Sequence, residues 1–488
     1  MSVLKAIILA AGEGTRMKSD TPKVLHPICG RPMIAYALNL VASAGVKQPI
    51  VVIGHGAEAV KAVLPKGIKV VIQSKRRGTA DAILAAKQSL GGMIGDVLIL
   101  YADTPLLRRT TVQHLIEHHH KNNATCTLLS THLADPSGYG RILREPTGEI
   151  TGILEESEVH GLQRGIREIN VGPMVCKVQA LMDALGTVKP SGSKQELYLT
   201  HAVSHLARQA DAKIHSIRVE ETSEALGVNS RADLAKAIGV VRQRIIELHL
   251  RNGVTIEDPQ STFIDQGVTI GHDTVIHPST VIETGTSIGK RCSVGPFARL
   301  RRGVSIGDEV RLGNFVELVR TKVGHRVRIN HVSYLGDSTV EEGANIGAGA
   351  ITANYDGTSK HATRIGKGAF IGSDTILIAP VSVGPGAVTG AGSVVPRAHD
   401  VPAKSLVVGV PARVVARSAS PDGRALQAAK KPRATKPKRA AAGAAPKGRA
   451  RRVRRANRQA RRATVHRRRG GARPSRRRAT ARRSTSRR

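Results

Sequence analysis

The stretch that decides the fold is residues 270–318, IGHDTVIHPSTVIETGTSIGKRCSVGPFARLRRGVSIGDEVRLGNFVEL, in which every sixth position is aliphatic. These positions are Ile270, Ile276, Ile282, Ile288, Val294, Leu300, Ile306, Leu312 and Leu318. An α-helix repeats every 3.6 residues and a half-exposed strand every 2, so a strict period of six fits neither. It predicts a prism wound from short parallel strands, in which each six-residue side turns one corner and points one aliphatic side chain inward.

The same ladder predicts a coil from about residue 253 to about residue 415. Its register slips by one residue after Leu318 and again before Val340, and a polar loop at 353–364 interrupts it. The ladder then resumes at Ile365. Coils of this kind occur mostly in acyltransferases, and loops that leave a regular coil commonly carry function.

Ahead of the coil, short apolar runs alternate with helical patterns. The runs are residues 3–9, 50–54, 69–73 and 97–103, and the helical patterns include 33–44 and 79–90. This alternation predicts a parallel sheet with helices on both faces, whose ligands bind at the carboxyl ends of the strands. Gly12, Gly54 and Asp103 follow predicted strands and should share one edge. Residues 231–251 predict one amphipathic helix that joins the sheet to the coil.

Size and cysteine content limit the class of protein. The 488 residues allow two or three domains, and the aromatic content of 2% without Trp suits aliphatic cores. The four cysteines are scattered, which predicts neither a zinc cluster nor a disulfide framework and favours a reducing cytosol. The apolar run at 6–12 faintly resembles a signal peptide, but it leads into a Gly-rich loop and is better interpreted as a buried strand. No run reaches the roughly 18 residues of a membrane span, so we expect a cytoplasmic protein.

The end of the chain is strongly basic. Residues 421–488 contain 27 Lys or Arg and one acidic residue, Asp422, which gives +26 of the chain's net +38. Because residues 416–488 have few large apolar side chains, we expect them to be disordered. Without aromatic residues the segment suits phosphate backbones, so nucleic acid is the first expected partner and an anionic membrane surface the second. A solubilising extension without a partner is the third alternative.

The first chemical motif is LAAGEGTRM at residues 9–17, followed by Pro22 and Lys23. Glycines allow backbone N–H groups to approach phosphate oxygens, and Arg16 and Lys23 can neutralise charge on a transferring group. The motif is not a P-loop, and Met17 replaces the third glycine of a dinucleotide-binding fingerprint. The string resembles that of the sugar nucleotidyltransferases, which join a nucleoside triphosphate to a sugar 1-phosphate.

Further motifs follow in the order that this resemblance implies. They are Gln73 with Gly78-Thr79, Tyr101-Ala102-Asp103, Gly138-Tyr139-Gly140-Arg141-Ile142, Glu155, Glu168-Ile169-Asn170 and Gly227-Val228-Asn229. With the coil, residues 3–400 resemble the bifunctional family of N-acetylglucosamine-1-phosphate uridylyltransferase and glucosamine-1-phosphate N-acetyltransferase enzymes. The resemblance implies an α/β fold. It comprises a Rossmann-like nucleotidyltransferase domain (1–230), a linker helix (231–252) and a left-handed parallel β-helix of hexapeptide repeats (253–415). The disordered tail (416–488), which is expected from its composition, lies beyond the resemblance.

The resemblance also implies a uridylyl-transfer site for UTP and N-acetylglucosamine 1-phosphate. Arg16 and Lys23 would bind phosphates during in-line attack on the α-phosphorus, and Asp103 and Asn229 would hold Mg²⁺. A turn cap is the alternative role for Asp103. The nucleotide and UDP-sugar contacts would be Leu9, Ala10, Ala11, Gly12, Lys23, Gln73, Gly78, Thr79, Tyr101, Asp103, Gly140, Glu155, Asn170 and Asn229.

A second site is implied on the coil, where RINHVSYLGD at residues 328–337 matches the family's segment around its catalytic histidine. His331 would be the general base for acetyl transfer from acetyl-CoA to glucosamine 1-phosphate, although a lone histidine in a coil can also be structural. The sugar-phosphate contacts would be Arg301, Tyr334 and Asn345. The acetyl-CoA contacts would be Ala348, Asn354, Tyr355, Ser373 and Ala391.

Two departures from the family pattern concern the second site. Val319 stands where the family has a lysine that contacts the sugar phosphate, and the neighbouring Arg320 should point to the opposite face. The ending at residues 409–413 resembles that of general hexapeptide acetyltransferases, with Arg413 as a possible replacement contact for coenzyme A. We therefore predict weaker affinity for glucosamine 1-phosphate or a changed acceptor.

Three functional classes follow from these observations. The first is a bifunctional enzyme that makes UDP-N-acetylglucosamine for cell-wall precursors. The second is a uridylyltransferase whose coil is mainly structural or acts on another acceptor, and the third is a nucleic-acid-binding protein built on an enzyme body. Coils of this kind usually associate as trimers, so we expect a homotrimer. His118, His119 and His120 are expected to be a solvated helix end rather than a metal site.

Overall fold

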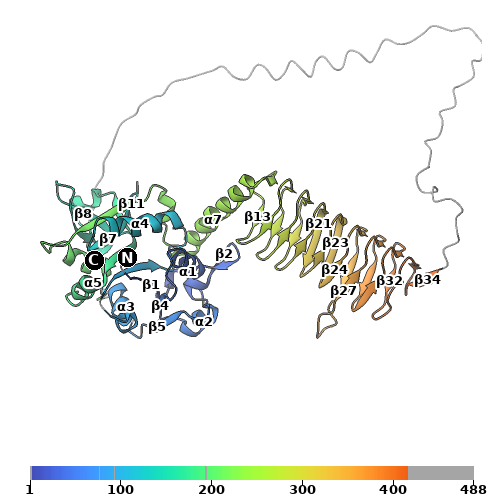
Figure 1. Ribbon diagram of the computed structural model, residues 1–488, viewed down its shortest axis with the longest axis horizontal. Helices are drawn as coiled ribbons and strands as arrows, with labels where there is room; N and C mark the ends of the chain where they lie inside the picture. The colour runs from blue at the N-terminus through green and yellow to red at the C-terminus, as the bar shows by residue number, and fades with distance from the viewer. Residues whose placement is uncertain (1–2, 76, 93, 193–194, 416–488) are drawn as a thin grey trace, which may run out of the picture. The chain divides into compact units, whose positions relative to one another are not determined.

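The computed structural model describes residues 3–75, 77–92, 94–192 and 195–415 (Figure 1). The expected disorder of residues 416–488 therefore lies outside the described residues. Within the described ranges, no helix is long and apolar enough to cross a membrane.

The N-terminal part is a sheet with helices on both faces, in the strand order β11-β7-β10-β6-β1-β4-β5. The strands are β1 (Leu4–Ala10), β4 (Ile50–Ile53), β5 (Lys69–Ile72), β6 (Asp96–Tyr101), β7 (Cys126–His132), β10 (Glu168–Lys177) and β11 (Ile214–Arg218), with β8 (Arg141–Arg144) and β9 (Ile150–Leu154) as a side hairpin. Successive side chains of a strand point to opposite faces, and Ile7 and Ile8 accordingly belong to two different buried clusters. The cluster of Ile7 includes helices α3 (Thr79–Ala85), α5 (Val178–Leu185) and α6 (Leu199–Leu206). The cluster of Ile8 includes α1 (Ile34–Ser43), α2 (Ala57–Val63) and α4 (Arg109–Lys121).

The sheet is mixed rather than purely parallel, which corrects the sequence-based expectation. β1 pairs in parallel with both β4 and β6, but β10 runs antiparallel to β6 and to β7. The physical reason is the connection. β10 is reached from the β8–β9 hairpin rather than through a crossover helix, and only a crossover returns the chain in the parallel direction.

The histidine expectation also needs correction. α4 ends at Lys121, as expected for a helix end, but His119 is only 1% exposed. Its Nδ1 lies 3.1 Å from Thr127 Oγ1 and its Nε2 lies 3.4 Å from Asp96 Oδ1. The helix end is therefore packed on β6 and β7, and His119 is a buried structural side chain. In the part of the chain that the structure describes, no group of three or more His, Cys, Asp or Glu could hold a metal ion.

The linker helix is confirmed as α7 (Arg231–Arg251). Ser230 caps its N-terminus by accepting a hydrogen bond from the backbone N–H of Asp233, and the Asp233 side chain accepts one in return. Such a reciprocal capping box fixes where a helix begins.

The C-terminal part is a parallel β-helix with three sides, as the period of six predicts. The first side contains β12 (Thr255–Ile256), β15 (Val275–Ile276), β18 (Ser293–Val294), β21 (Arg311–Val319), β23 (Arg328–Gly336), β25 (Asn345–Ile346), β28 (Phe370–Ile371), β31 (Val388–Thr389) and β33 (Leu406–Val408). The second contains β13 (Phe263–Ile264), β16 (Val281–Ile282), β19 (Arg299–Leu300), the later halves of β21 and β23, β26 (Ile351–Ala353), β29 (Ile376–Ile378) and β32 (Val394–Val395). The third contains β14 (Thr269–Ile270), β17 (Ser287–Ile288), β20 (Ser305–Ile306), β22 (Lys322–Val323), β24 (Ser338–Val340), β27 (Thr363–Ile365) and β30 (Val381–Val383). β34 (Arg413–Val415) closes the end antiparallel to β33.

The predicted register slip is confirmed by the pairing of the coils. Ser293 pairs with Arg311, 18 residues later, whereas Arg311 pairs with Arg328, 17 residues later. The loop that leaves the coil lies between the end of β26 at Ala353 and the start of β27 at Thr363. Both irregularities fall in the part of the coil that carries the predicted acetyl-transfer residues.

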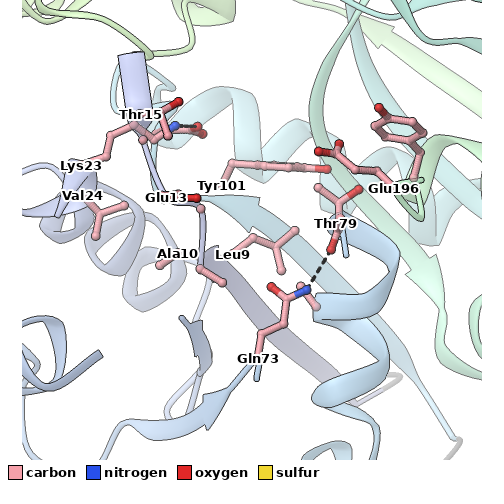
Figure 2. Close-up of a pocket in the computed structure, with 17 residues that line it drawn as sticks. Leu9, Ala10, Glu13, Thr15, Lys23, Val24, Gln73, Thr79, Tyr101 and Glu196 are labelled. Carbon is pink, nitrogen blue, oxygen red and sulfur yellow. Dashed lines mark hydrogen bonds and ion pairs between the residues drawn. The ribbon is translucent and has the colours of Figure 1, made fainter. Parts of the chain in front are cut away.

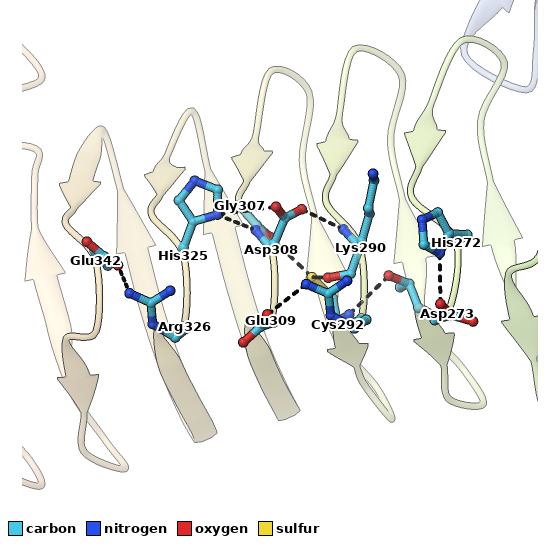
Figure 3. Close-up of polar contacts among 12 residues, drawn as sticks. His272, Asp273, Lys290, Cys292, Gly307, Asp308, Glu309, His325, Arg326 and Glu342 are labelled. Atoms are coloured by element: carbon cyan, nitrogen blue, oxygen red, sulfur yellow. Dashed lines mark hydrogen bonds and ion pairs between the residues drawn. The ribbon is translucent and has the colours of Figure 1, made fainter.

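At the corners of the coil, several residues other than glycine have the left-handed backbone conformation with positive φ. Ion pairs follow one of these corners from coil to coil. Arg291 and Glu309 have φ values of 53° and 61°, and Arg291 Nη2 lies 2.8 Å from Oε1 of Glu309, which is labelled in Figure 3. Arg326 and Glu342 continue the row in the following coils. Left-handed backbone is costly for residues with a Cβ, and the regular ladder on either side holds it in place.

Candidate functional sites

A cleft of about 360 Å³ opens at the carboxyl edge of the N-terminal sheet (Figure 2). Its lining is Leu9, Ala10, Ala11, Gly12, Glu13, Gly14, Thr15, Lys23, Val24, Gln73, Gly78, Thr79, Ala82, Tyr101, Asp103, Glu196 and Tyr198. The predicted nucleotide contacts from Leu9 to Asp103 are therefore brought together. Arg16 is exposed on the same loop and is not among the lining residues.

Two glycines allow the close approaches that shape this cleft. Gly14 has φ +67°, and a Cβ there would lie 2.7 Å from the Cβ of Lys23. Gly78 has φ +109°, and a Cβ there would lie 2.5 Å from the backbone oxygen of Leu197. The first glycine lets Lys23 fold over the loop, and the second brings Glu196 and Tyr198 to the cleft.

In this cleft a lysine side chain lies between a carboxylate oxygen and an amide oxygen. Lys23 is 9% exposed, and its Nζ lies 2.5 Å from Asp103 Oδ2 and 3.1 Å from Asn229 Oδ1. Asp103 follows β6, and its backbone oxygen accepts a hydrogen bond from the N–H of Val228. The backbone N–H of Asn229 donates a hydrogen bond to the Asp233 side chain at the start of α7, which fixes the position of Asn229. Two oxygen donors thus converge on one cation position, which suits a hard cation such as Mg²⁺ that keeps water and phosphate as its other ligands.

The far end of the cleft fixes an amide side chain. Gln73 is 5% exposed, and its Nε2 donates to Gly78 O at 3.0 Å and to Asp81 Oδ2 at 2.8 Å. Thr79 Oγ1 accepts a hydrogen bond from the backbone N–H of Leu199. With both amide hydrogens committed, Gln73 has a defined orientation, as recognition of a base edge requires.

The resemblance assigns the sugar to Gly140, Glu155, Asn170 and Asn229, and none of these four is among the residues that line the cleft. The N–H of Asn170 donates to Gly140 O at 2.9 Å, and Thr200 Oγ1 donates to Glu155 Oε1 at 2.5 Å. Desolvation raises the pKa of Glu155 above its usual range. Desolvation, together with the charges of Glu155 and Asp103, also raises the pKa of Tyr101. Burial therefore disfavours the charged form of both groups.

Several lining residues were missed by sequence reasoning. Glu13, Gly14, Thr15 and Val24 lie within or beside the recognised motif, so proximity in sequence was a usable signal. Glu196 and Tyr198 had no such signal, because only the close approach at Gly78 brings them to the cleft. Desolvation and the neighbouring Glu196 raise the pKa of Tyr198 to about 12, so its hydroxyl keeps its proton.

On the coil, the predicted catalytic residue and three of the predicted acetyl-CoA contacts lie along one corner. The backbone oxygen of Val332, which follows His331, accepts from Gly349 N at 2.7 Å. In the next coils Ala348 O accepts from Asp374 N, and Ser373 O accepts from Gly392 N. Since each of these bonds joins one coil to the next at the same corner, His331, Ala348, Ser373 and Ala391 form a continuous row.

The partner of His331 is Asn314, to which the sequence analysis assigned no role. His331 pairs with Asn314 in the ladder, and its Nδ1 lies 3.1 Å from Asn314 Oδ1. An amide oxygen accepts a hydrogen bond only from a protonated Nδ1, which leaves Nε2 of His331 as the basic atom. The next residues, Phe315 and Val332, have φ values of 56° and 31°. A β-branched residue in that region is strained, which is common beside functional side chains.

The predicted sugar-phosphate contacts flank this corner. Asn345 lies on the first side, while Arg301 and Tyr334 belong to the second. Arg301 Nε lies 3.1 Å from Glu317 Oε1, so its charge is already partly neutralised.

Neither Val319 nor its neighbour Arg320 takes the place of the family's lysine. Val319 is 4% exposed, and Arg320 Nε and Nη2 lie 2.5 and 2.8 Å from the two carboxylate oxygens of Asp337. This bidentate pair lowers the pKa of Asp337. Arg320 is therefore committed to Asp337 and does not occupy the position of the missing lysine.

The loop that leaves the coil is tied down at both ends. Asn354 is 6% exposed, and its Nδ2 donates to Asp337 Oδ2 at 2.5 Å. Asp356 accepts from the backbone N–H groups of the loop and pairs with His361 Nε2 at 2.6 Å and Arg397 Nη2 at 2.9 Å. These bonds hold the pKa of Asp356 far below its usual range. Tyr355, between the two anchors, is 59% exposed, and Arg413 is exposed on β34.

Comparisons with known proteins match the N-terminal sheet and the C-terminal coil to two different families. Residues 6–168 match the MobA-like NTP transferase domain, and residues 267–302 and 362–397 match the bacterial transferase hexapeptide (six repeats). The chain is 40% identical over 441 residues to the bifunctional protein GlmU of Brevibacillus brevis, which covers 84% of this chain and 95% of that protein. It is 41% identical over 411 residues to the GlmU of Pelotomaculum thermopropionicum, covering 78% and 90%, and 41% identical over 436 residues to that of Heliobacterium modesticaldum, covering 83% and 94%. The chain therefore belongs to the bifunctional GlmU family, whose members join a nucleotidyltransferase domain to a hexapeptide-repeat acyltransferase domain.

Proposed function

We propose that this enzyme makes UDP-N-acetylglucosamine in two steps, with the β-helix acting first. Residues 253–415 acetylate glucosamine 1-phosphate with acetyl-CoA. Residues 1–230 then transfer UMP from UTP to N-acetylglucosamine 1-phosphate and release pyrophosphate. The observation that carries the proposal is the convergence of Lys23, Asp103 and Asn229 at the cleft, because phosphoryl chemistry needs cations and a metal site there.

Uridylyl transfer needs positioning rather than a covalent protein nucleophile. Gln73 and Thr79 would orient the uracil, and Gly140, Glu155, Asn170 and Asn229 would bind the sugar. A sugar-phosphate oxygen then attacks the α-phosphorus of UTP in line, and the bond to pyrophosphate breaks. Lys23, which lines the cleft, and Arg16, which is exposed on the same loop, would neutralise charge that develops on the phosphates.

Mg²⁺ is the metal that this site fits, with Asp103 and Asn229 as the protein ligands. Bound there, the ion would neutralise phosphate charge and align the triphosphate. Lys23 Nζ contacts the same two oxygens, so Lys23 would share this position with the metal and would bind a phosphate beside it.

Acetyl transfer needs a base and a bound thioester. Nε2 of His331 would take a proton from the amine of glucosamine 1-phosphate as the amine attacks the acetyl carbonyl, and the bond to the coenzyme A sulfur breaks. Asn314 would hold the histidine in the productive tautomer. Ala348, Ser373 and Ala391, in the row beyond His331, would bind acetyl-CoA together with Asn354 and Tyr355.

The proposal extends to the oligomeric state, the location and the partner of the basic tail. We propose a cytoplasmic homotrimer that supplies cell-wall precursors. An exposed aromatic stack on the coil supports self-association, since Phe297 and Phe315 are 52% and 56% exposed with ring centroids 5.2 Å apart. The basic tail after residue 415 would bind nucleic acid through its phosphates.

A second candidate is favoured by one observation. Val319 is buried and Arg320 is bound to Asp337, so neither residue supplies the cation that the family's lysine would bring to the sugar phosphate, and Arg301 is already paired with Glu317. The alternative enzyme is a uridylyltransferase whose β-helix is mainly structural or acts on a different acceptor.

One paired assay tests both candidates, in which pyrophosphate release and thiol release are measured on the same sample. For the bifunctional enzyme, Lys23→Ala should lower pyrophosphate release about 100-fold or more and leave thiol release intact. His331→Ala should do the reverse, by about 100-fold to 10,000-fold. Lys47→Ala, an exposed lysine of the same domain, is the control. Thiol release unchanged by His331→Ala would exclude its role as base, and an absence of thiol release in the wild type would select the second candidate.

A further inference from the structure

Another cavity in the nucleotidyltransferase domain is lined by none of the residues assigned to either reaction. It measures about 340 Å³ and lies beside β8, which is labelled in Figure 1. Its polar lining includes Arg141, Arg164, Arg167, Asp135, Ser137 and Glu156. Three guanidinium groups around one small cavity are an arrangement that suits an anion.

Arg141 is the buried member of this set. It is 3% exposed, and its Nη1 is held by Glu156 at 2.8 Å and by the backbone oxygen of Tyr139. Its Nε is buried without a hydrogen-bond partner among the described residues. A buried donor without an acceptor is costly, and most native structures supply a partner. The guanidinium at the cavity wall is therefore incompletely satisfied by the protein alone.

The remaining charges leave a positive surplus in the cavity. Asp135 is engaged by Ser137, whose N–H and Oγ lie 3.1 and 2.6 Å from its Oδ1. Glu156 is engaged by Arg141. Arg164 takes part in none of the ion pairs that the structure describes, and Arg167 donates only to a backbone oxygen, that of Ala134. Both acids are thus committed, while two exposed arginines are available to a ligand.

The cavity residues are sequence neighbours of the proposed sugar contacts. Arg141 follows Gly140, and Glu156 follows Glu155. Arg167 precedes β10, which carries Asn170. A ligand that draws on the cavity residues would therefore act on the three segments that hold the sugar.

We propose that this cavity binds a small phosphoryl anion, inorganic phosphate or pyrophosphate, and that its occupancy changes the affinity of the cleft for the sugar phosphate. Phosphoryl oxygens match the planar fork of a guanidinium in pairs, and charge-assisted bonds of this kind are the strong ones. The binding itself is independent of the reaction. Only the coupling to the sugar rests on the proposed function.

The test of binding is titration calorimetry with pyrophosphate, in chelator, on the full chain. The Lys23→Ala variant serves as background, so that the catalytic cleft contributes little. We expect saturable binding that weakens at least tenfold when Arg164→Gln and Arg167→Gln are added. Both arginines are exposed, so these changes should not impair folding. Arg208→Gln removes an exposed arginine that lines a different cavity and should have no effect. The basic tail adds a background that is equal in all variants.

Three results would overturn the binding proposal. They are an absence of saturable binding in the Lys23→Ala background, binding that survives the loss of both arginines, and citrate binding as tightly as pyrophosphate. Inorganic phosphate in a parallel titration shows whether one phosphoryl group is enough. For the coupling, added phosphate should shift the KM for N-acetylglucosamine 1-phosphate at least twofold in the wild type and not in the double variant. Equal shifts in both would refute the coupling even if the enzyme makes UDP-N-acetylglucosamine.

Discussion

At the scale of single residues, the pKa values of Glu155 and Glu158 are shifted in opposite directions, so the two carboxyl groups stabilise the fold at opposite ends of the pH range. Desolvation raises the pKa of Glu155. Desolvation also acts on Glu158, but hydrogen bonds from Ser191 and His201 outweigh it and lower the pKa of Glu158. A carboxyl whose folded pKa is raised contributes stability at low pH that is lost as pH rises through the folded pKa. One whose folded pKa is lowered contributes stability above its unfolded pKa that is lost as pH falls.

These relations give a paired prediction. Relative to the wild type, Glu155→Gln should raise the Tm increasingly as pH rises from about 4 to 8, because the amide avoids the cost of ionisation. Glu158→Gln should lower the Tm at neutral pH, and the difference should shrink as the solution becomes acidic. Thermal unfolding of the three proteins across this range is the measurement. Parallel Tm curves for Glu155→Gln and the wild type would contradict the stated environment of Glu155.

Val319 supplies the second prediction at this scale. A lysine at position 319 would lie one coil from Arg301, because Arg301 N donates to Leu318 O in the ladder. Val319→Lys should therefore lower the KM for glucosamine 1-phosphate about threefold to tenfold, the range expected for one charged contact whose ammonium group extends from a buried backbone position to the sugar phosphate. Thr339→Lys places the same charge at an exposed position on the third side and is the control. An equal effect of both variants would point to general attraction rather than a specific contact.

At the scale of elements, the loop after β26 is an irregular segment held by specific side-chain contacts. Asp356 organises it by accepting backbone hydrogen bonds and by pairing with His361 and Arg397. Asp356→Asn should loosen the loop and raise the KM for acetyl-CoA several-fold, with little effect on pyrophosphate release. Asp400→Asn is a matched control, since Asp400 is an exposed corner residue that accepts a hydrogen bond from Ser382 N. An unchanged KM in Asp356→Asn would remove the loop from the acetyl-CoA site.

The sequence predicted elements well where the signal was local and periodic. The hexad ladder predicted the coil and its slip after Leu318, and the helical pattern predicted α7, because each depends on spacing along the chain. The reversed direction of β10 was not predictable in this way, since the strand pattern is the same in either direction. The burial of His119 depends on β6 and β7, which pack against it from elsewhere in the sequence.

The same distinction applies to the candidate sites. The cleft from Leu9 to Asp103 was predicted from motifs that place their residues on one sheet edge. Glu196 and Tyr198 reach the cleft through one close backbone approach at Gly78, more than a hundred residues earlier in the chain. Arg397 reaches the loop across the stacked coils. Contacts between distant segments leave no periodic trace, so only the folded structure identifies them.

At the scale of the whole molecule, charge divides the chain into a modestly basic body and a strongly basic tail. The net charge of +26 for residues 421–488 leaves +12 of the chain's +38 for residues 1–420. If the tail binds DNA through its phosphates, log K should fall steeply and linearly with log salt, because each neutralised phosphate releases counterions. The full chain should then lose about 10³-fold or more in affinity between 50 and 200 mM salt.

A truncation after Val415 tests this attribution, because it keeps every strand that the structure describes at the end of the coil. The shortened enzyme should lose DNA binding while both activities in the paired assay stay within about twofold of the full chain, since every residue proposed for either site lies before residue 416. Fluorescence anisotropy with a labelled duplex at several salt concentrations measures the binding. Binding that persists after truncation would assign the DNA contact to the folded body, and salt-insensitive binding by the full chain would exclude a phosphate-driven tail. Anionic vesicles titrated in parallel distinguish a membrane surface, the second expected partner, from nucleic acid.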